Sequence, residues 1–380
     1  MKAFLKDRLG HDRYYALVGL WHRIIGKKSR KPLRWESYAD HPEFDPALKD
    51  MLVNCGTGGV SDYWKELTDK NVEQLIQCGF GNFKQTVALN YFTFIEFLNP
   101  NHPQVKFLES HLSQEDIALA KSLAATSPKH AFFPLEQSRF YNYATYLFWR
   151  YLLIEGAGDI LEKVGEPGLG NPLAVAIGPK LFSQDLANSI LEYQSITRHG
   201  SGFGSVLEIG AGYGRNAHLL LSLHPDLKYI IVDIPPALYI SQRYLSEIFR
   251  NKTIFRYRNF LDFEQIRKEF LAADVIFLTP GQMEQLDDKS VDLCLAVDCL
   301  HEMRPERIRE YFDTITRISG GLYFKCRKET KIPFDNIVLT EKDYPLPAGW
   351  KKIYSKECRV QVNFFEALYR GNGDSALFRK

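Results

Sequence analysis

The stretch Ser205-Val-Leu-Glu-Ile-Gly-Ala-Gly-Tyr-Gly214 decides the fold class of this 380-residue chain. Its first half is a short aliphatic run, and its second half places a glycine at every other position. Glycines that follow a strand and precede a helix form a turn at which a ligand can approach the main chain. The sequence therefore predicts a strand over residues 205–209, a ligand-binding turn and a helix over residues 216–223.

The rest of this half of the chain continues the same alternation. Predicted strands cover residues 205–209, 229–233, 275–278, 291–297 and 321–324, and predicted helices cover 216–223, 236–249 and 305–318. Strands that alternate with helices form a parallel sheet covered on both faces. Two strand-like runs, 350–354 and 360–369, follow each other without a long helix between them. We therefore expect an α/β domain over residues 201–380, with an antiparallel C-terminal edge.

Residues 35–200 are predicted to form a mainly helical cap domain. Aromatic and aliphatic residues occupy every face of a helix expected at 139–155, which is typical of a buried helix. Ser183 is the candidate N-cap of a helix over 183–197 that leads into the sheet domain. Before it, Gly165-Glu-Pro-Gly-Leu-Gly-Asn-Pro172 marks a loop, which is either a plain turn or part of the cleft.

The first 34 residues form a basic amphipathic segment. They carry ten Lys or Arg against Asp7 and Asp12, and these surround the apolar run Tyr14-Tyr-Ala-Leu-Val-Gly-Leu-Trp21. Two interpretations are open. Either the segment is a helix on an anionic membrane surface, with its apolar face immersed, or it is a solvated helix packed on the rest of the protein. Peripheral contact with a membrane through residues 1–34 is therefore one of two expectations.

Composition narrows the classes of function. A formal net charge of +2 does not predict a nucleic-acid groove, and we expect no nucleic-acid partner. The six cysteines include no Cys-x-x-Cys pair, so their spacing supports neither a zinc knuckle nor a disulfide framework. No apolar run has the length of a membrane-spanning helix, and we expect neither a signal peptide nor a membrane span. We expect a cytoplasmic protein, with the inner face of the membrane as its alternative location.

The spacing of the glycines argues against a dinucleotide. The fingerprint G-x-G-x-x-G would place its third glycine at position 215, where Arg215 stands. The run instead resembles the acidic-x-G-x-G-x-G pattern of Rossmann-like methyltransferases. In that pattern, a carboxylate at the strand end faces the ammonium group of S-adenosylmethionine. The corresponding residues of this chain are Glu208, Gly210, Gly212 and Gly214.

Two further strand ends complete the predicted cofactor site. Asp233 ends the next strand, 21 residues after Gly212, and a carboxylate in that position can accept both ribose hydroxyls. Asp233 is also a candidate N-cap for the helix that a Pro-Pro pair introduces, and the two roles are compatible. After the third strand, Gln282 and Met283 are candidates for contacts with the adenine, or else members of an ordinary loop.

The segment Asp298-Cys-Leu-His-Glu-Met303 follows the fourth predicted strand, so it should lie beside the transferable methyl group. Methylation of an alcohol requires removal of the hydroxyl proton, and a histidine with a pKa near neutrality suits that task. His301 is the candidate general base, and Glu302 or Asp298 would orient it or stabilise its charge. The alternative is a histidine that only caps or packs at the next helix. The stretch is not a zincin motif, because Pro305 stands where H-E-x-x-H needs its second histidine. The sequence therefore requires no metal, although Asp298, His301 and Glu302 could contribute ligands to one.

Several motifs together resemble the bacterial sugar O-methyltransferase family. They are Leu207-Glu-Ile-Gly-Ala-Gly-Tyr-Gly-Arg215, Tyr229-Ile-Ile-Val-Asp-Ile-Pro-Pro-Ala-Leu238, Ser241-Gln-Arg-Tyr-Leu245 and His301-Glu-Met303. The Asp-Ile-Pro-Pro extension is the specific part, and the resemblance covers about residues 130–370. It implies S-adenosylmethionine as the cofactor, with Arg215 and Ile234 among the cofactor-binding residues. It also implies methylation of a sugar hydroxyl in glycan or glycoside biosynthesis.

The acceptor implied by this resemblance is a small molecule or glycan, such as a nucleotide sugar, a glycoside or a polysaccharide. Two alternatives stay open. The chain is a methyltransferase of another small molecule or lipid precursor, or a non-catalytic binding subunit that resembles one. The N-P-P-Y type signature of N-methyltransferases does not follow the fourth predicted strand, which favours oxygen as the methylated atom. A homo-oligomer is an open expectation for the assembly.

Overall fold

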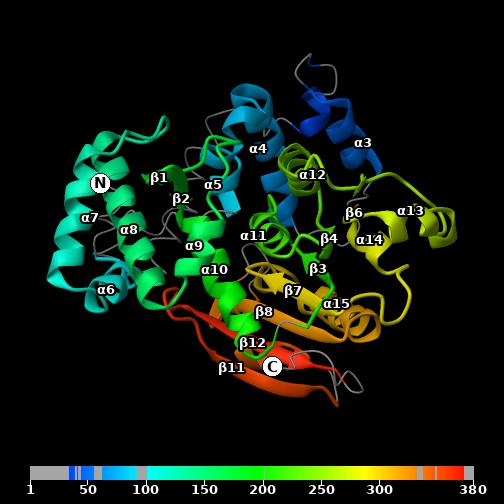
Figure 1. Cartoon of the computed structure of the whole chain (residues 1–380). Coiled ribbons are helices and arrows are strands. Elements are labelled where there is room, and N and C mark those ends of the chain that lie inside the picture. The colour runs from blue at the N-terminus through cyan, green and yellow to red at the C-terminus, as the bar shows by residue number, and fades with distance from the viewer. Residues whose placement is uncertain are drawn as a thin grey trace.

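The computed structural model describes residues 34–38, 41, 44–54, 62–91, 101–200, 202–331, 337–346 and 349–371. Its centre is an eight-stranded sheet with the order β11-β12-β8-β7-β3-β4-β6-β5 (Figure 1). Neighbouring strands are parallel except for the two pairs that β12 makes, with β8 and with β11. Apart from Arg34, the basic N-terminal segment of the sequence analysis lies outside the described residues.

The strands of this sheet are short and mostly buried. They are β3 (Ser205–Ile209), β4 (Lys228–Val232), β5 (Ile254–Phe255), β6 (Val275–Leu278), β7 (Leu293–Val297), β8 (Gly321–Arg327), β11 (Lys351–Glu357) and β12 (Phe364–Arg370). Successive side chains of a strand point to opposite faces. Val206 and Leu207 accordingly belong to two different hydrophobic clusters. The core of this half of the protein therefore has two layers, one on each face of the sheet.

Helices cover both faces. They are α11 (Arg215–Leu223), α12 (Ala237–Ile248), α13 (Arg267–Ala272), α14 (Pro280–Met283) and α15 (Pro305–Ile318), with the 3-10 helices η4 (Phe263–Gln265), η5 (Leu300–Glu302) and η6 (Glu341–Asp343). Helices α11 and α12 pack in the cluster that contains Val206, and α13 and α15 pack in the cluster that contains Leu207. In α15, Ile308, Phe312 and Ile315 recur at helical spacing, and all are buried.

The residues before the sheet are mainly helical. Their elements are η1 (Trp35–Tyr38), α3 (Pro46–Asn54), α4 (Asp62–Cys78), η2 (Phe80–Gln85), α5 (Ala88–Tyr91), α6 (Pro103–Ser110), α7 (Gln114–Thr126), α8 (Leu135–Ile154), α9 (Gly158–Lys163), β1 (Ala174–Ile177), β2 (Lys180–Ser183) and α10 (Gln184–Thr197). Helices α6, α7 and α8 lie together at one end of the molecule, and α3 and α4 lie near α12 (Figure 1). Tyr239 of α12 donates a hydrogen bond of 2.6 Å to Asp45, just before α3.

Helix α10 joins the helical part to the sheet. The hydroxyl oxygen of Ser183 accepts the main-chain N–H of Leu186 at 3.0 Å, which confirms the predicted N-cap. Near the other end of the helix, Ser195 donates to Glu366 of β12 at 2.9 Å. One helix therefore carries the chain from the β1–β2 hairpin onto the β8–β12 side of the sheet.

These observations confirm the predicted fold class, a Rossmann-like methyltransferase sheet with a mainly helical N-terminal part. The predicted strands 205–209 and 275–278 and the predicted helix 305–318 coincide with β3, β6 and α15. The hairpins β1–β2 and β9–β10 (Glu329–Lys331 and Val338–Thr340), with β5, α13 and α14, were not predicted, because segments of two to six residues carry little periodicity. The antiparallel strand β12 lies one position inside the edge, and β11 forms the edge.

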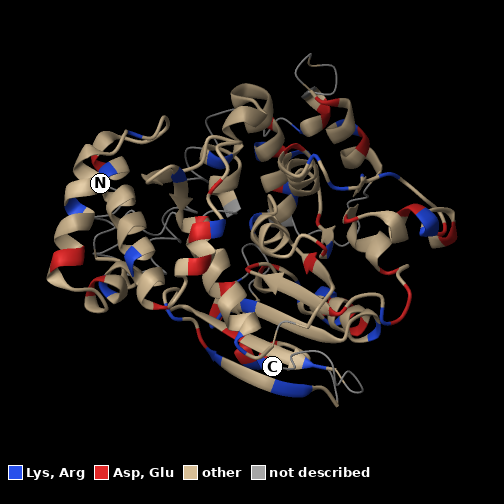
Figure 2. Ribbon diagram, viewed as in Figure 1, with Lys and Arg blue, Asp and Glu red and all other residues tan. Residues whose placement is uncertain are grey.

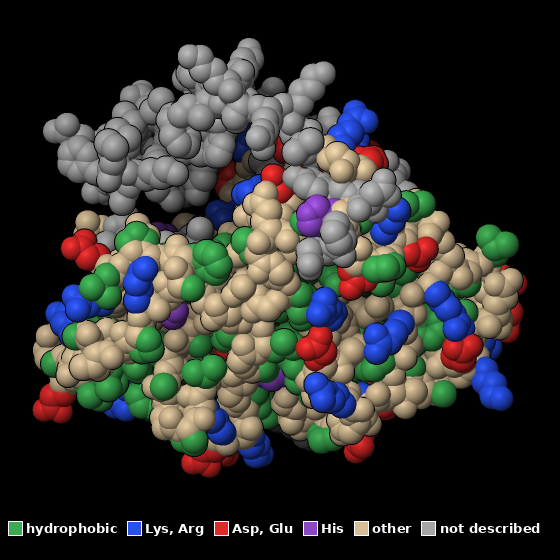
Figure 3. Space-filling model, turned by 90° about the horizontal axis from the view of Figure 1, so that it is seen from above, with side chains coloured by type: hydrophobic (Ala, Val, Ile, Leu, Met, Phe, Trp, Pro, Cys, Tyr) green, Lys and Arg blue, Asp and Glu red, His purple; other side chains and the backbone are tan. Residues whose placement is uncertain are grey.

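Charged residues of both signs are spread over the helices and the edge strands (Figure 2). On the face seen in Figure 3, hydrophobic side chains are scattered among charged ones. In the described part of the chain, no helix combines the length and the apolarity needed to cross a bilayer. Five cysteines lie among the described residues, and all five are free thiols: Cys78, Cys294, Cys299, Cys326 and Cys358.

Candidate functional site

The carboxyl ends of β3, β4, β6 and β7 meet at one edge of the sheet. From β3 the chain proceeds outward to β4 and to the edge strand β5, comes back to β6 between them, and then forms β7 on the other side of β3. In an open parallel sheet, this reversal of strand order creates a crevice at the carboxyl ends, and ligands bind there. The glycine turn at residues 210–214 directly follows β3, so it lies at this point.

All three glycines of the turn have positive φ. The values are +66° at Gly210, +61° at Gly212 and +90° at Gly214, in the region that other residues rarely adopt. Gly210 is also tightly enclosed, because an added Cβ would lie 2.5 Å from the Cβ of Cys299. Backbone conformation alone therefore accounts for these glycines. Whether the turn serves a ligand depends on the side chains around it.

Asp233 fastens the turn to the end of β4. One carboxylate oxygen accepts the N–H of Gly212 at 2.8 Å, and the other accepts the N–H of Ile234 at 2.7 Å. The residue is 8% exposed, and burial raises the pKa of Asp233 to about 7, with a further increase from the nearby Glu208. The structure thus brings the second predicted cofactor residue and the half-buried Ile234 directly against the first motif.

Glu208 lies two residues before the turn and is almost fully buried. Its two oxygens accept hydrogen bonds from Asn216 at 2.9 Å and from the Tyr229 hydroxyl at 2.8 Å. Burial raises the pKa of Glu208 to about 7, although these two hydrogen bonds lower it. Each carboxylate oxygen has a second lone pair, so these bonds leave acceptor capacity for a ligand.

The predicted cofactor residue Arg215 is held by α10. Its guanidinium forms a two-pronged ion pair with Glu192, at 2.7 and 3.0 Å, and donates to Ser189 at 2.8 Å. Lys325 of β8 also donates to Glu192 at 2.7 Å. Burial opposes ionisation of Glu192, but Arg215 and Lys325 outweigh it and lower the pKa of Glu192 to about 2. Sequence reasoning missed Glu192, since nothing local distinguishes it from other acidic residues of an amphipathic helix.

The two adenine candidates have structural roles in the described conformation. Gln282 forms a capping box with Thr279 at the start of α14, and its Nε2 donates to the carbonyl of Arg258 at 2.8 Å. Met283 is 1% exposed and belongs to a hydrophobic core cluster. Both lie after β6 as predicted, and their contact with a cofactor remains a prediction.

Asp298, His301 and Glu302 lie together after β7. The Asp298 side chain is 24% exposed, whereas the His301 side chain is 3% exposed, and 3.4 Å separates Asp298 Oδ1 from His301 Nε2. Asp298 has φ +59°, an unusual conformation for a residue other than glycine and one that recurs at functional sites. The His301 ring packs against Phe364 at 5.9 Å between ring centres. Its Nδ1 has no hydrogen-bond partner among the described residues.

Burial has opposite effects on the members of this group. It raises the pKa of Asp298 to about 6 and that of Glu302 to about 8, where the charge of Asp298 adds to the effect. It lowers the pKa of His301 to about 3, and nearby Arg327 lowers it further. Near neutral pH the histidine is therefore uncharged and a weak proton acceptor. Asp298 is ionised at that pH, and it is the more exposed of the two.

The four carboxyl groups Glu208, Asp233, Asp298 and Glu302 give the crevice its electrostatic character. Burial raises the pKa of all four, and their like charges add to this effect at Asp233 and Glu302. A cation placed among them would favour their ionised forms, whereas an anion would be repelled. Within the described part of the chain, no three His, Cys, Asp or Glu side chains are grouped as metal ligands would be.

The N-terminal part adds a buried network beside the glycine turn. The hydroxyl of Tyr213, inside the turn, donates to Asp185 at 2.7 Å. Lys84 forms an ion pair with Glu166, donates to the Tyr244 hydroxyl at 2.9 Å, and lies 4.8 Å from the centre of the Tyr213 ring. Asp185 and Lys84 therefore connect the helical part to the turn, and Glu166 of the predicted loop at residues 165–172 pairs with Lys84. Sequence reasoning missed this lysine because Glu166 is 82 positions away.

No family model and no curated protein matches the chain. It is similar to the solved structure of a SAM dependent methyltransferase from Aquifex aeolicus, with 15% identity over 47% of this chain and 88% of that one and a TM-score of 0.29. It is also similar to magnesium protoporphyrin IX methyltransferase from Synechocystis PCC 6803 with bound SAH (12% identity, 50% and 86% covered, TM-score 0.34). A third similar structure is mitomycin 7-O-methyltransferase (12% identity, 80% and 84% covered, TM-score 0.33).

Proposed function

We propose that this protein is an S-adenosylmethionine-dependent methyltransferase. The observation that supports it most is the group of buried carboxyl groups with raised pKa values around a glycine turn at the switch point of the sheet. S-adenosylmethionine carries a sulfonium and an ammonium against one carboxylate, so its net charge is positive. A dinucleotide carries two negative charges on its diphosphate, which this crevice would repel. Charge complementarity and the glycine spacing therefore favour the same cofactor.

The residues at the ends of β3 and β4 fit this cofactor. Asp233 would accept the ribose hydroxyls through its remaining lone pairs while it continues to hold the turn. Glu208 would act on the ammonium mainly through its charge, because Asn216 and Tyr229 already orient its oxygens. When bound, S-adenosylmethionine supplies a methyl group on a positively charged sulfur, which an attacking oxygen takes in line.

For the acceptor, we propose a hydroxyl group whose proton passes to Asp298. As the oxygen attacks the methyl carbon, the carbon–sulfur bond breaks, its electron pair stays on sulfur, and the carboxylate takes the hydroxyl proton. The pKa of Asp298, raised to about 6, suits a base near neutral pH. This proposal revises the roles given to the pair in the sequence analysis. His301, buried and 3.4 Å from Asp298, would orient the carboxylate instead of contacting the acceptor.

A sugar is the acceptor that the family resemblance favours, in glycan or glycoside biosynthesis. The helical N-terminal part, which reaches the glycine turn through Lys84 and the 165–172 loop, would form one wall of the acceptor cleft. The main alternative class is a methyltransferase-like binding subunit without turnover. Detection of S-adenosylhomocysteine formation with any acceptor separates the two classes.

Calorimetric titration with S-adenosylmethionine and with NADH tests the cofactor. We expect binding of S-adenosylmethionine alone, weakened about 10- to 100-fold by Asp233→Asn, because a charged hydrogen-bond acceptor is lost. Asp274→Asn is the matched control, since Asp274 also accepts a main-chain N–H, that of Thr253, but stands just before β6 at the opposite edge of the sheet. NADH binding, or no binding of either molecule, would refute the proposal.

Turnover tests the base. Asp298→Asn should lower kcat by about 10²- to 10⁴-fold while cofactor affinity stays nearly unchanged. The wild-type rate should rise with pH through about 6 as the Asp298 carboxyl ionises. His301→Ala should reduce the rate less than Asp298→Asn does. If the histidine variant is the more severely impaired of the two, His301 is the base and the original assignment stands.

A further inference from the structure

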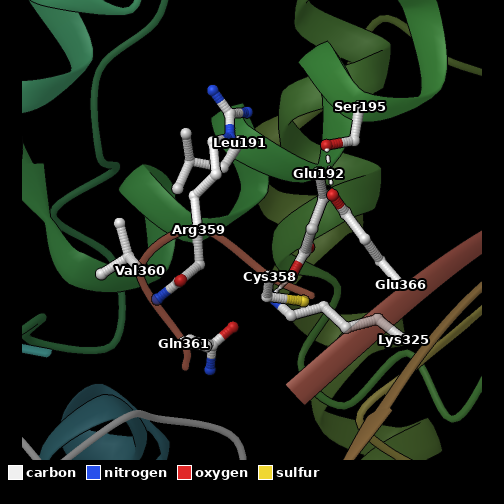
Figure 4. Close-up of a pocket in the computed structure, with 10 residues that line it drawn as sticks. Leu191, Glu192, Ser195, Lys325, Cys358, Arg359, Val360, Gln361 and Glu366 are labelled. Atoms are coloured by element: carbon white, nitrogen blue, oxygen red, sulfur yellow. Dashed lines mark hydrogen bonds and ion pairs between the residues drawn. The ribbon is translucent and has the colours of Figure 1, made fainter. Parts of the chain in front are cut away.

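A narrow pocket lies between α10, β8 and the turn that joins β11 to β12 (Figure 4). Its lining includes Asn188 and Glu192 of α10, Lys325 of β8, and Arg359 and Gln361 of the turn. These residues come from three segments far apart in the sequence. The pocket therefore exists only in the assembled fold.

The charged groups that line this pocket are paired within the protein. Glu192 accepts hydrogen bonds from Lys325, which lines the pocket, and from Arg215, which does not. Arg359 forms an ion pair with Glu155 at the end of α8. However, Nη2 of Arg359 has no hydrogen-bond partner among the described residues. The pocket therefore offers a charged N–H donor to an oxygen atom of a ligand.

Two amide side chains of the pocket have atoms without hydrogen-bond partners. Gln361 is 1% exposed, and neither its amide nitrogen nor its amide oxygen has a hydrogen-bond partner among the described residues. Asn188 is equally buried; its nitrogen donates to the carbonyl of Gln184, and its oxygen likewise has no partner in the described part of the chain. Buried polar groups are nearly always hydrogen-bonded, so these three atoms call for a partner from outside the chain.

We propose that this pocket binds one hydroxyl group of a polyhydroxylated acceptor such as a sugar, an inference that rests on the proposed methyltransferase function. A hydroxyl donates one hydrogen bond and accepts two. It can accept from the Gln361 amide nitrogen and from Nη2 of Arg359, and it can donate to one amide oxygen, that of Gln361 or that of Asn188. Because the space is narrow, it takes a single hydroxyl or hydroxymethyl group and leaves the rest of the acceptor outside.

The pocket is connected to the proposed reaction centre. The carbonyl of Lys325 accepts the N–H of Asp298 at 2.8 Å, so the pocket wall continues into the end of β7. The carbonyl of Gln361 accepts the N–H of Phe364 at 2.8 Å, and Phe364 packs on the His301 ring. An acceptor anchored by one hydroxyl in this pocket would therefore present another hydroxyl near the proposed base.

Gln361→Leu is the test variant, since leucine fills a similar volume and removes both unpartnered amide atoms. The variant should be at least as stable as the wild type, because no hydrogen bond within the described protein is lost. The matched control is Gln104→Leu. Gln104 of α6 is fully buried, its amide atoms also have no partner among the described residues, and it does not line the pocket.

Binding is measured by saturation-transfer NMR of the full chain with the methyl glycosides of glucose, galactose, mannose and rhamnose. The measurement is made with and without S-adenosylhomocysteine. We expect at least one glycoside to bind, with about tenfold weaker binding in Gln361→Leu and unchanged binding in Gln104→Leu. If no glycoside binds the wild type, or if Gln361→Leu binds equally well, the pocket holds only water and the inference is wrong. Failure of S-adenosylhomocysteine to bind in the same samples would instead count against the proposed function.

Discussion

The pH dependence of cofactor binding tests the electrostatic account of the crevice. In the free protein, burial raises the pKa values of Glu208 and Asp233 to about 7. A bound sulfonium and ammonium favour the ionised carboxylates, so binding between pH 5.5 and 7.5 should release protons from these groups. This range lies below the pKa of the cofactor's own α-amino group, at about 8.

The expected magnitude follows from the linkage between proton release and affinity. For each carboxyl group that ionises on binding, affinity rises by nearly tenfold per pH unit below its pKa, or about 1.4 kcal/mol. One such group gives about tenfold tighter binding at pH 6.5 than at pH 5.5, and two give up to about a hundredfold. The increase should level off above about pH 7.5, where both groups are already largely ionised in the free protein.

The raised pKa values of Glu208 and Asp233 also determine how the stability of the protein changes with pH. In the folded protein, both pKa values exceed the ordinary pKa values of 4.5 for Glu208 and 3.8 for Asp233. These groups therefore favour the fold at pH values below about 4, and that contribution is lost as the pH rises to about 7. A bound cation offsets the loss, so the cofactor should raise Tm by more at pH 7.5 than at pH 5.5.

Titration calorimetry in two buffers with different heats of ionisation counts the protons released at pH 5.5, 6.5 and 7.5. Asp233→Asn should remove one of the released protons, and Asp274→Asn should remove none. S-adenosylhomocysteine lacks the sulfonium charge, so its affinity should rise less steeply with pH. An affinity for S-adenosylmethionine that does not change with pH, without proton release, would refute the electrostatic account.

Three further predictions concern the fold and the N-terminal segment. Lys84→Met leaves the Glu166 carboxylate buried without its cation and should cost about 3–5 kcal/mol of unfolding free energy in urea; a loss below about 1 kcal/mol would contradict this assignment. Gly210→Ala should cost about 1–3 kcal/mol because of its positive φ and its contact with Cys299. Combining Gly210→Ala with Cys299→Gly should restore the part of this stability loss that comes from the contact with Cys299. An unchanged Tm of Gly210→Ala alone would rule out backbone strain at this position. The full chain should float with anionic vesicles and a chain lacking residues 1–34 should not, so equal flotation would remove the membrane interpretation.

The sheet could be predicted from sequence because its elements carry their own signals. The run at 205–209 is aliphatic and ends in glycines, and the hydrophobic stripe of α15 is sustained over four turns. One predicted site position also had a local signal of a structural role. Thr279 and Gln282 have the spacing of a capping box, S/T-x-x-E/Q, so the structural role of Gln282 was readable in the sequence.

The rest of the site depends on contacts between distant segments. Phe364, which lies 63 residues further along the chain, packs on the His301 ring, and burial of this ring lowers the pKa of His301 to about 3, which makes the histidine a weak base. Glu192 is an ordinary helix residue in sequence, and only the packing of α10 places it between Arg215 and Lys325. Gln361 lies in a hairpin turn where a polar residue would be expected to face solvent, yet it is 1% exposed. Local patterns carry no information about these three environments.

The distribution of buried charge favours an active binding site over a degenerate one. Elsewhere the fold pairs its buried charges, as in Lys84 with Glu166 and in Arg215 with Glu192. At Asp233, burial raises the pKa of the carboxyl group, and the nearby charge of Glu208 adds to that effect. Such a pair lowers the stability of the free protein near neutral pH, and a scaffold that bound no cofactor would gain from losing it. The arrangement is therefore best explained if a cation completes it, which is the charge that S-adenosylmethionine brings to the end of β3.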